Sequence, residues 1–164
     1  MRAIVVYESH WGNTAEVARA IAEGIGPEAQ ALNTDEATPA VVAEADLVVA
    51  GAPIMAFGLP SDAMIENVGK DPKAPVPGDI SHPPLRHWLE SLPASSAAAA
   101  SFETKLRWSP GGATGAIDDR LHRAGFRTIV KGAKFLVSSP YGPLREGEVE
   151  RARAWGGELA AAIR

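Results

Sequence analysis

The sequence contains no cysteine among its 164 residues. Disulfide bonds, thiolate metal ligands and cysteine nucleophiles are therefore excluded. Long apolar runs are also missing, because none approaches the roughly 20 residues that cross a membrane. The first run, residues 3–7, is too short for the core of a signal peptide. We expect one cytoplasmic domain over residues 1–164 that is not bound to a membrane.

Neither positive nor negative residues are in large excess. The chain has 16 Lys and Arg against 20 Asp and Glu, which gives a formal net charge of −4. A general nucleic-acid binder carries a basic surface, so we expect no nucleic-acid partner. The G-x-x-x-x-G-K-[ST], G-x-G-x-x-G and G-x-S-x-G motifs of P-loop, dinucleotide-binding and hydrolytic proteins are absent. The four histidines match no metal-binding spacing, so no metal site is expected.

Short apolar runs alternate with helical patterns along the chain. The runs "RAIVVY" and "DLVVAG" predict strands that are buried on both faces. Strands are predicted over residues 2–7, 28–32, 46–51, 97–105 and 126–139, the last with a break near Gly132. Helices are predicted over residues 13–24, 38–45, 83–92, 115–125 and 149–163, and the proline-rich residues 69–84 are predicted as a loop. This alternation predicts an α/β fold with a parallel sheet covered on both faces.

Three loops meet at one edge of the predicted sheet, where the carboxyl ends of parallel strands lie together and ligands bind. The first, "SHWGNT", opens a helix whose N-terminal N–H groups carry partial positive charge. Ser9, Asn13 and Thr14 add side-chain donors, and Gly12 allows the backbone to approach a ligand closely. These features predict a phosphate site without Lys or Arg. A plain turn, with Asn13 and Glu16 as a capping box, is the alternative.

The other two loops offer apolar and aromatic surface. The loop "APIMAFGLP" follows the third strand, and its large apolar side chains are costly to expose together. They cover either the edge of the core or one face of a planar ligand. The loop "KLRWSPGGAT" follows the fourth strand and offers Trp108 for stacking, with Gly111 and Gly112 for backbone contacts. Trp108 alone is more often a packing residue, but the three loops together favour a flat ligand that carries a phosphate.

These loops resemble those of the flavodoxin family. "SHWGNT" matches the [ST]-x-x-G-N-T phosphate loop of that family, in the same place between the first strand and the first helix. The stretch from "AKFLVSSP" to the end is similar to the last strand and helix of short-chain flavodoxins, so the resemblance covers nearly the whole chain. It implies a flavodoxin-like, doubly wound three-layer sandwich with a five-stranded parallel sheet of order 2-1-3-4-5. It also implies non-covalently bound FMN.

The resemblance assigns the cofactor contacts by position. The FMN phosphate would be held by Ser9, His10, Trp11, Gly12, Asn13 and Thr14. One side of the isoalloxazine would be flanked by Ala52, Pro53, Ile54, Met55, Ala56, Phe57 and Gly58, where Ile54 and Met55 replace the hydroxyl and aromatic residues of many flavodoxins. The other side would be flanked by Lys105, Leu106, Arg107, Trp108, Ser109, Gly111 and Gly112, with Trp108 as the aromatic. No catalytic side chain is implied, and His10 either contacts the phosphate or ribityl chain or is a solvated loop residue.

Three functions remain open. The first is electron transfer through FMN, with a redox partner protein or an NAD(P)H-linked reductase. The second is an FMN-dependent NAD(P)H:quinone-type reductase, in which residues 69–84 form a wall or a dimer contact. The third is a flavin-free module that binds another protein, and the oligomeric state is left open. Electron-carrying flavodoxins are usually more acidic near the flavin, so Lys105 and Arg107 predict a higher potential, because a cation stabilises anionic reduced flavin.

Overall fold

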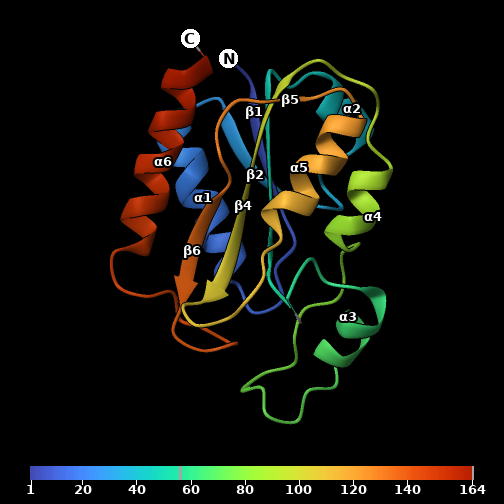
Figure 1. The fold of residues 1–164 in the computed structure, drawn as a ribbon, viewed down its shortest axis with the longest axis vertical. Helices are drawn as coiled ribbons and strands as arrows, with labels where there is room; N and C mark the ends of the chain where they lie inside the picture. Colours follow the sequence, from blue (N-terminus) through green and yellow to red (C-terminus); the bar gives the residue numbers. More distant parts are fainter. Residues whose placement is uncertain (56, 164) are drawn as a thin grey trace.

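A parallel sheet forms the middle layer of the molecule (Figure 1). The computed structural model describes residues 1–55 and 57–163. The strands are β1 (Ala3–Tyr7), β2 (Ala29–Asn33), β3 (Leu47–Pro53), β4 (Ala98–Leu106), β5 (Arg127–Thr128) and β6 (Ala133–Val137). Their order is β2-β1-β3-β4-β5, and β6 also pairs with β4. Because β5 and β6 are two pieces of the predicted last strand, the order 2-1-3-4-5 and the break near Gly132 are confirmed.

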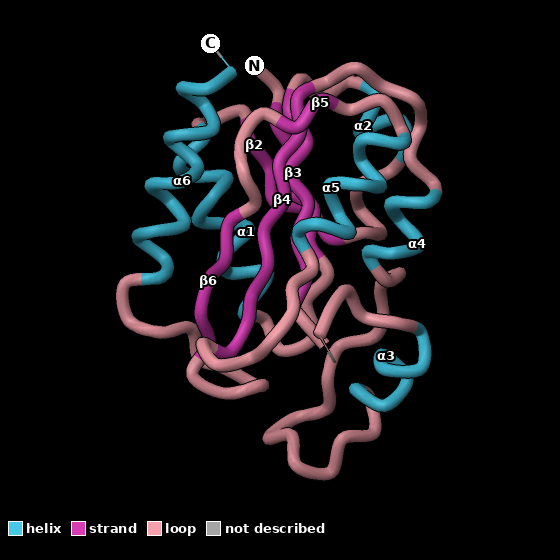
Figure 2. The backbone as a smooth tube through the Cα atoms, viewed as in Figure 1, coloured by secondary structure: helices cyan, strands magenta, loops and turns pink. Residues whose placement is uncertain are grey.

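Helices cover both faces of the sheet (Figure 2). One face packs against α1 (Asn13–Ile25) and α6 (Glu148–Ile163), and the other packs against α2 (Pro39–Ala43), α4 (Leu85–Glu90) and α5 (Thr114–Arg123). The three-layer arrangement is therefore confirmed. Helix α3 (Asp62–Val68), which the sequence did not predict, lies with residues 69–84 beyond the carboxyl ends of the strands. None of the helices in the described part of the chain is long and apolar enough to cross a membrane.

Each central strand contributes to two separate cores. In β3, Val49 packs toward α1 and α6, whereas Val48 packs toward α4 and α5. Strand β4 does the same with small side chains, since Ala99 and Ala100 are fully buried on opposite faces. Alanine has a low β propensity, but burial under helices on both faces overrides it. The strand predicted over residues 97–105 is confirmed as β4.

The helix starts agree only partly with the sequence prediction. Thr38 is the N-cap of α2, and its side chain accepts a hydrogen bond from the backbone N–H of Val41 at 3.4 Å. The predicted capping box of Asn13 and Glu16 is wrong, because α1 begins after Gly12, a left-handed N-cap with φ 94°. The backbone of Gly12 thereby directs the first turn of α1 toward the end of β1.

Helices α1 and α6 cross through paired glycines. A Cβ atom on Gly24 would lie 1.9 Å from the carbonyl oxygen of Arg153, and one on Gly156 would lie 2.2 Å from that of Ile21. No side chain fits at either position. The contact between the two backbones therefore depends on glycine, and it holds α1, with the loop that precedes it, close to α6.

Candidate functional site

The three loops surround a cavity of about 190 Å³ beyond the carboxyl ends of the strands. Eleven of the residues predicted from the sequence line it: Ser9, His10, Trp11, Asn13, Thr14, Pro53, Ile54, Met55, Lys105, Leu106 and Ser109. Three lining residues were not predicted, namely Thr104, Val137 and Pro140. Thr104 lies near the end of β4, Val137 ends β6, and Pro140 lies in the loop that follows β6, so the rule that ligands bind at strand ends would have found them.

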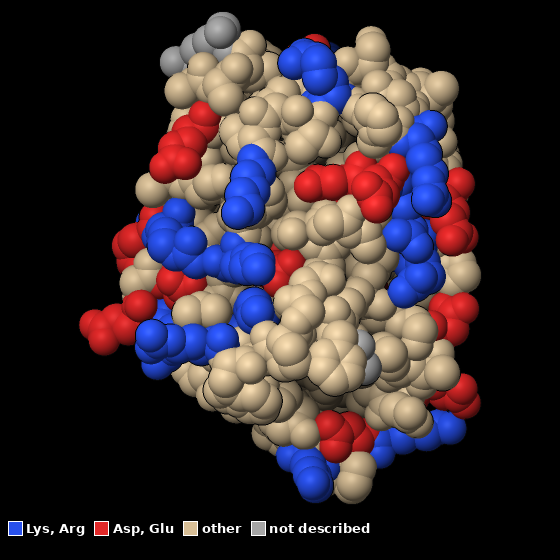
Figure 3. All heavy atoms as spheres, in the orientation of Figure 1, with Lys and Arg blue, Asp and Glu red and all other residues tan. Residues whose placement is uncertain are grey.

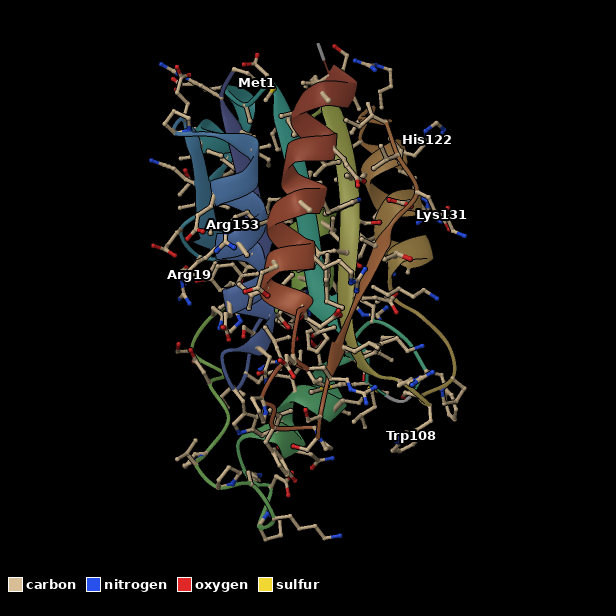
Figure 4. All side chains as sticks on the ribbon, turned by 90° about the vertical axis from the view of Figure 1, so that its left-hand side faces the viewer. Met1, Arg19, Trp108, His122, Lys131 and Arg153 are labelled. Carbon is tan, nitrogen blue, oxygen red and sulfur yellow. The ribbon has the colours of Figure 1, made fainter. Side chains whose placement is uncertain are left out.

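The other predicted contacts lie outside the lining of this cavity. They are Gly12, Ala52, Phe57, Gly58, Arg107, Trp108, Gly111 and Gly112, while Ala56 lies outside the described residues. Trp108 is 78% exposed, and Figure 4 shows it at the tip of its loop, pointing away from the sheet. Its stacking role stays a prediction.

The first loop forms a neutral cradle at the N-terminus of α1. The N–H of Gly12 donates to the Ser9 hydroxyl at 3.2 Å, which closes the turn. The first-turn N–H groups of Asn13 and Thr14 have no partner within the helix and therefore point outward. The Thr14 hydroxyl, almost fully buried, lies 2.8 Å from the Thr104 hydroxyl of β4. The cradle thus offers backbone donors to an anion, and β4 fixes its far end.

The second and third loops hold each other by their backbones. Met55 and Gly58 exchange two hydrogen bonds, at 2.9 and 3.1 Å, and the N–H of Gly112 donates to the carbonyl of Phe57 at 3.0 Å. Phe57 has φ 77°, an uncommon value for a residue with a side chain. Gly111 has φ 84°, and a Cβ there would lie 2.1 Å from the Phe57 oxygen. This strained junction leaves the Phe57 ring 68% exposed.

The loop end of the molecule carries little charge on one face. In Figure 3 the centre of the lower half, which holds the loops after β4 and β6 in Figure 1, is largely free of Lys, Arg, Asp and Glu. Phe57 and Trp108 are the most exposed large apolar side chains of the described residues. Exposed apolar surface on the loops around a cavity suits a ligand or partner with an apolar face.

A buried carboxylate and imidazole lie beneath the first loop. Glu8 is fully buried, and its Oε2 lies 2.7 Å from Nε2 of His10. Its Oε1 accepts a hydrogen bond from the N–H of Leu85, the first residue of α4, at 2.8 Å. The Nδ1 of His10 lies 2.7 Å from the carbonyl oxygen of Asp79. His10 is therefore neither solvated nor free to contact a phosphate through its ring nitrogens.

The pKa values of the two buried histidines of this region shift in opposite directions. Burial opposes a charge on His10, but the hydrogen bonds to Glu8 and to the Asp79 carbonyl outweigh it and raise the pKa of His10 above its ordinary value. Burial lowers the pKa of His82. The Nε2 of His82 accepts the Ser9 N–H at 3.2 Å, and its ring stacks on His10 with centroids 5.9 Å apart. The pair therefore combines an imidazole that favours its charged form with one that favours its neutral form.

Residues 69–84 pack against the first loop. The indole N–H of Trp11 donates to the carbonyl of Val76 at 3.0 Å, and the Tyr141 hydroxyl donates to the Asp71 carboxylate at 2.7 Å. The rings of Trp11 and Tyr141 meet edge to face at 4.9 Å. The hydrogen bond to Tyr141 lowers the pKa of Asp71. The sequence predicted a wall or a dimer contact here, and within this chain the loop forms a wall beside the cradle.

A second buried carboxylate, Glu103, belongs to β4. Its Oε1 accepts the N–H groups of Ala113 at 2.8 Å and Thr114 at 3.1 Å, at the start of α5. Within the described chain, neither α4 nor α5 has a side-chain cap of its own. Glu8, which directly follows β1, and Glu103 of β4 supply these caps, because a carboxylate is favourable at a helix N-terminus. The sequence signal was an acidic residue at the end of each apolar strand, and it was missed.

No protein-family model and no curated protein sequence matches the chain. Solved structures do match along nearly its whole length. A flavodoxin from the domain Archaea is 20% identical, with a TM-score of 0.69 and 99% of each chain covered. A Streptococcus pneumoniae flavodoxin is 17% identical, with a TM-score of 0.67 and 98% and 99% covered. Flavodoxin 1 from Bacillus cereus is 19% identical, with a TM-score of 0.65 and 98% of each covered.

These identities are low, so the likeness concerns the fold. It agrees with the strand order β2-β1-β3-β4-β5 and with the helices on both faces of the sheet. The chain therefore has a flavodoxin-like α/β fold.

Proposed function

We propose that the protein binds FMN non-covalently at the cavity between the three loops and acts as a redox protein that transfers electrons. The observation that carries this proposal is the composition of the cavity wall. Backbone donors at the start of α1 lie on one side, and Ile54, Met55 and Leu106 supply apolar surface on the other. A phosphate needs the first and a planar ring system needs the second.

The residues present suit this cofactor. Asn13 and Thr14 would hold the phosphate through N–H groups at a helix N-terminus, without Lys or Arg in the loop. Apolar side chains of the second and third loops would exclude water from the ring system. Bound FMN would supply the redox chemistry, and the protein would position it and adjust its potential. Lys105 is the one Lys or Arg residue among the described residues that line the cavity.

Absorbance and fluorescence test the proposal directly. Purified protein is expected to show flavin bands, or to quench the fluorescence of added FMN after the cofactor is removed. Asn13→Asp places a negative charge in the cradle, so it is expected to weaken FMN binding at least about tenfold while affecting riboflavin little. Gln30→Glu, which adds the same charge on exposed β2, is the matched control. Colourless protein that quenches no FMN would instead favour a flavin-free module that binds another protein.

A groove beside the cavity favours the FMN-dependent NAD(P)H:quinone-type reductase as a second candidate function. A groove of about 430 Å³ adjoins the cavity and shares Trp11, Met55 and Pro140 with it. Its other walls come from α3, including Met64, from residues 70–72, and from Tyr141 in the loop after β6. A second planar molecule would find apolar surface there. Steady NAD(P)H oxidation with a quinone by the purified protein would support this function, and turnover only with a partner reductase would support the electron carrier.

A further inference from the structure

We propose that His10 and Glu8 are positioning residues that make phosphate binding at the first loop proton-dependent, with the loop binding a phosphate more tightly while His10 is protonated. This inference rests on the proposed phosphate site and adds a control to it. Neither residue is assigned contact with the ligand through its polar side-chain atoms, because these atoms already have partners in the protein.

The hydrogen bonds of His10 require two ring protons. Nδ1 faces the carbonyl oxygen of Asp79, which only accepts, and Nε2 faces the carboxylate of Glu8. A neutral imidazole has one N–H, so it satisfies one of these acceptors and turns a lone pair toward the other. The imidazolium satisfies both. Loss of its proton therefore breaks one of two buried hydrogen bonds, unless Glu8 takes up a proton.

These hydrogen bonds act directly on the shape of the first loop. The N–H of Asp79 donates to the backbone carbonyl of His10 at 2.8 Å, and the Asp79 carbonyl faces Nδ1 of the His10 ring, so the backbone of residue 79 contacts His10 twice. The neighbouring N–H of Ser9 donates to Nε2 of His82 at 3.2 Å. Residues 79–82 thus fix the first two residues of the cradle. When the His10 ring loses its hydrogen bond, one of the contacts between residues 79–82 and the first loop is removed.

The net charge of Glu8 and His10 also favours anion binding only while His10 is protonated. The first loop has no Lys or Arg, and Glu8 is a fully buried carboxylate beneath it. Protonated His10 neutralises that carboxylate, whereas neutral His10 leaves its charge to repel a phosphate dianion. The ionisable groups that face His10 are Glu8 from the end of β1, and Asp79 and His82 from the loop before α4.

The shifts in the pKa values of His10 and His82 determine how phosphate affinity is expected to depend on pH. The pKa of His10 is raised, because its hydrogen bonds outweigh burial, so the charged form persists to a higher pH than that of an ordinary histidine. Phosphate affinity is then expected to fall as pH rises through this pKa. The pKa of His82 is lowered by burial, and its protonation at acid pH removes the acceptor of the Ser9 N–H. The profile is therefore expected to have a maximum between the two.

The test compares the dissociation constants of FMN and riboflavin between pH 5.5 and 9.5 by flavin fluorescence. For the wild type, FMN affinity is expected to fall about fivefold or more as pH rises through the His10 pKa, while riboflavin affinity stays level. His10→Gln is expected to bind FMN weakly and without this fall. Because the phosphate of FMN titrates near pH 6 in every variant, the difference between wild type and His10→Gln carries the result. Equal profiles for the two would overturn the inference.

Two variants separate positioning from a general loss of structure. Glu8→Gln keeps the acceptor for the Leu85 N–H and offers an amide donor to Nε2 of His10, so it allows a neutral imidazole to keep both contacts. It is expected to bind FMN at pH 9 as tightly as at pH 7, and a fall like that of the wild type would contradict the proposal. His87→Gln is the matched control, because His87 lies 2.7 Å from the Asp62 carboxylate on the surface. It is expected to keep the wild-type profile.

Inorganic phosphate distinguishes this inference from the proposed cofactor. If no flavin binds, titration of phosphate is followed by NMR through the amide signals of Asn13 and Thr14, together with the ring signals of His10. A response that weakens as His10 loses its proton would support the inference and reject FMN. No phosphate response at any pH would overturn the inference as well. FMN binding that ignores the state of His10 would support the cofactor and reject the inference.

Discussion

Glu103 Oε1, near the end of β4, lies 2.8 Å from the backbone nitrogen of Ala113, the N-cap of α5. The same oxygen accepts the N–H of Thr114, and Oε2 is buried without a partner among the described residues. Glu103→Ala is expected to lower the free energy of unfolding by about 2–4 kcal/mol, because two N–H groups lose a charged acceptor and a cavity forms. Urea denaturation measures this loss. A change below about 0.5 kcal/mol would reject the capping role.

Folding stability is expected to depend on pH through His10. Its folded pKa is raised, so the stabilisation is fully present below the ordinary pKa of about 6.5 and is lost as pH rises through the folded value. His10→Gln is therefore expected to cost about 1–3 kcal/mol at pH 6 and less at pH 9. Denaturation of both proteins at the two pH values checks this. A cost that is larger at pH 9 would contradict the assignment of the imidazolium.

The glycine crossing of α1 and α6 gives a packing prediction. Gly24→Ala is expected to destabilise the protein by about 1–3 kcal/mol or more, because the added Cβ meets the Arg153 carbonyl at 1.9 Å. Gly115→Ala is the matched control, since a Cβ there meets nothing within 4 Å and α5 is a helix. It is expected to stabilise by about 0.5–1 kcal/mol. Thermal unfolding of the two variants gives the comparison, and equal effects would contradict the close approach.

The sequence predicted the fold because its signals are local. Buried strands such as β1 and β3 are continuous apolar runs, and the start of α1 follows a recognisable loop. Helix α3 was missed because its seven residues form only about two turns, which is too short for a helical repeat of apolar residues to stand out. The partner of Glu8 was missed because its contact with Leu85 joins residues 77 apart in the chain. The partner of Glu103 was missed although Ala113 lies only 10 residues away, because the contact depends on how the loop after β4 returns to the start of α5. An acidic residue near the end of each apolar strand was visible in the sequence, but the N–H group that it contacts depends on the tertiary structure.

The candidate site was predicted unevenly for a related physical reason. The first loop was found through its composition, but the direction of Trp108 depends on a turn that the sequence does not specify. The environment of His10 was left open, because it depends on residues 79–82 folding back onto the loop. The sequence therefore identified which loops meet, whereas the structure shows which of their side chains line the cavity.

The structure changes which cation is expected to control the flavin potential. Arg107 is exposed and does not line the described cavity, whereas Lys105 is half-buried and lines it. A cation stabilises anionic reduced flavin, and its effect grows as solvent is excluded. If about 1–2 kcal/mol of this interaction survives screening, Lys105→Met lowers the one-electron potential by about 40–90 mV, since about 1.4 kcal/mol corresponds to 59 mV. Arg107→Ala is the matched comparison and is expected to lower it less. Redox titration of the FMN-loaded proteins measures both, and a higher potential in Lys105→Met would reject this role for the lysine.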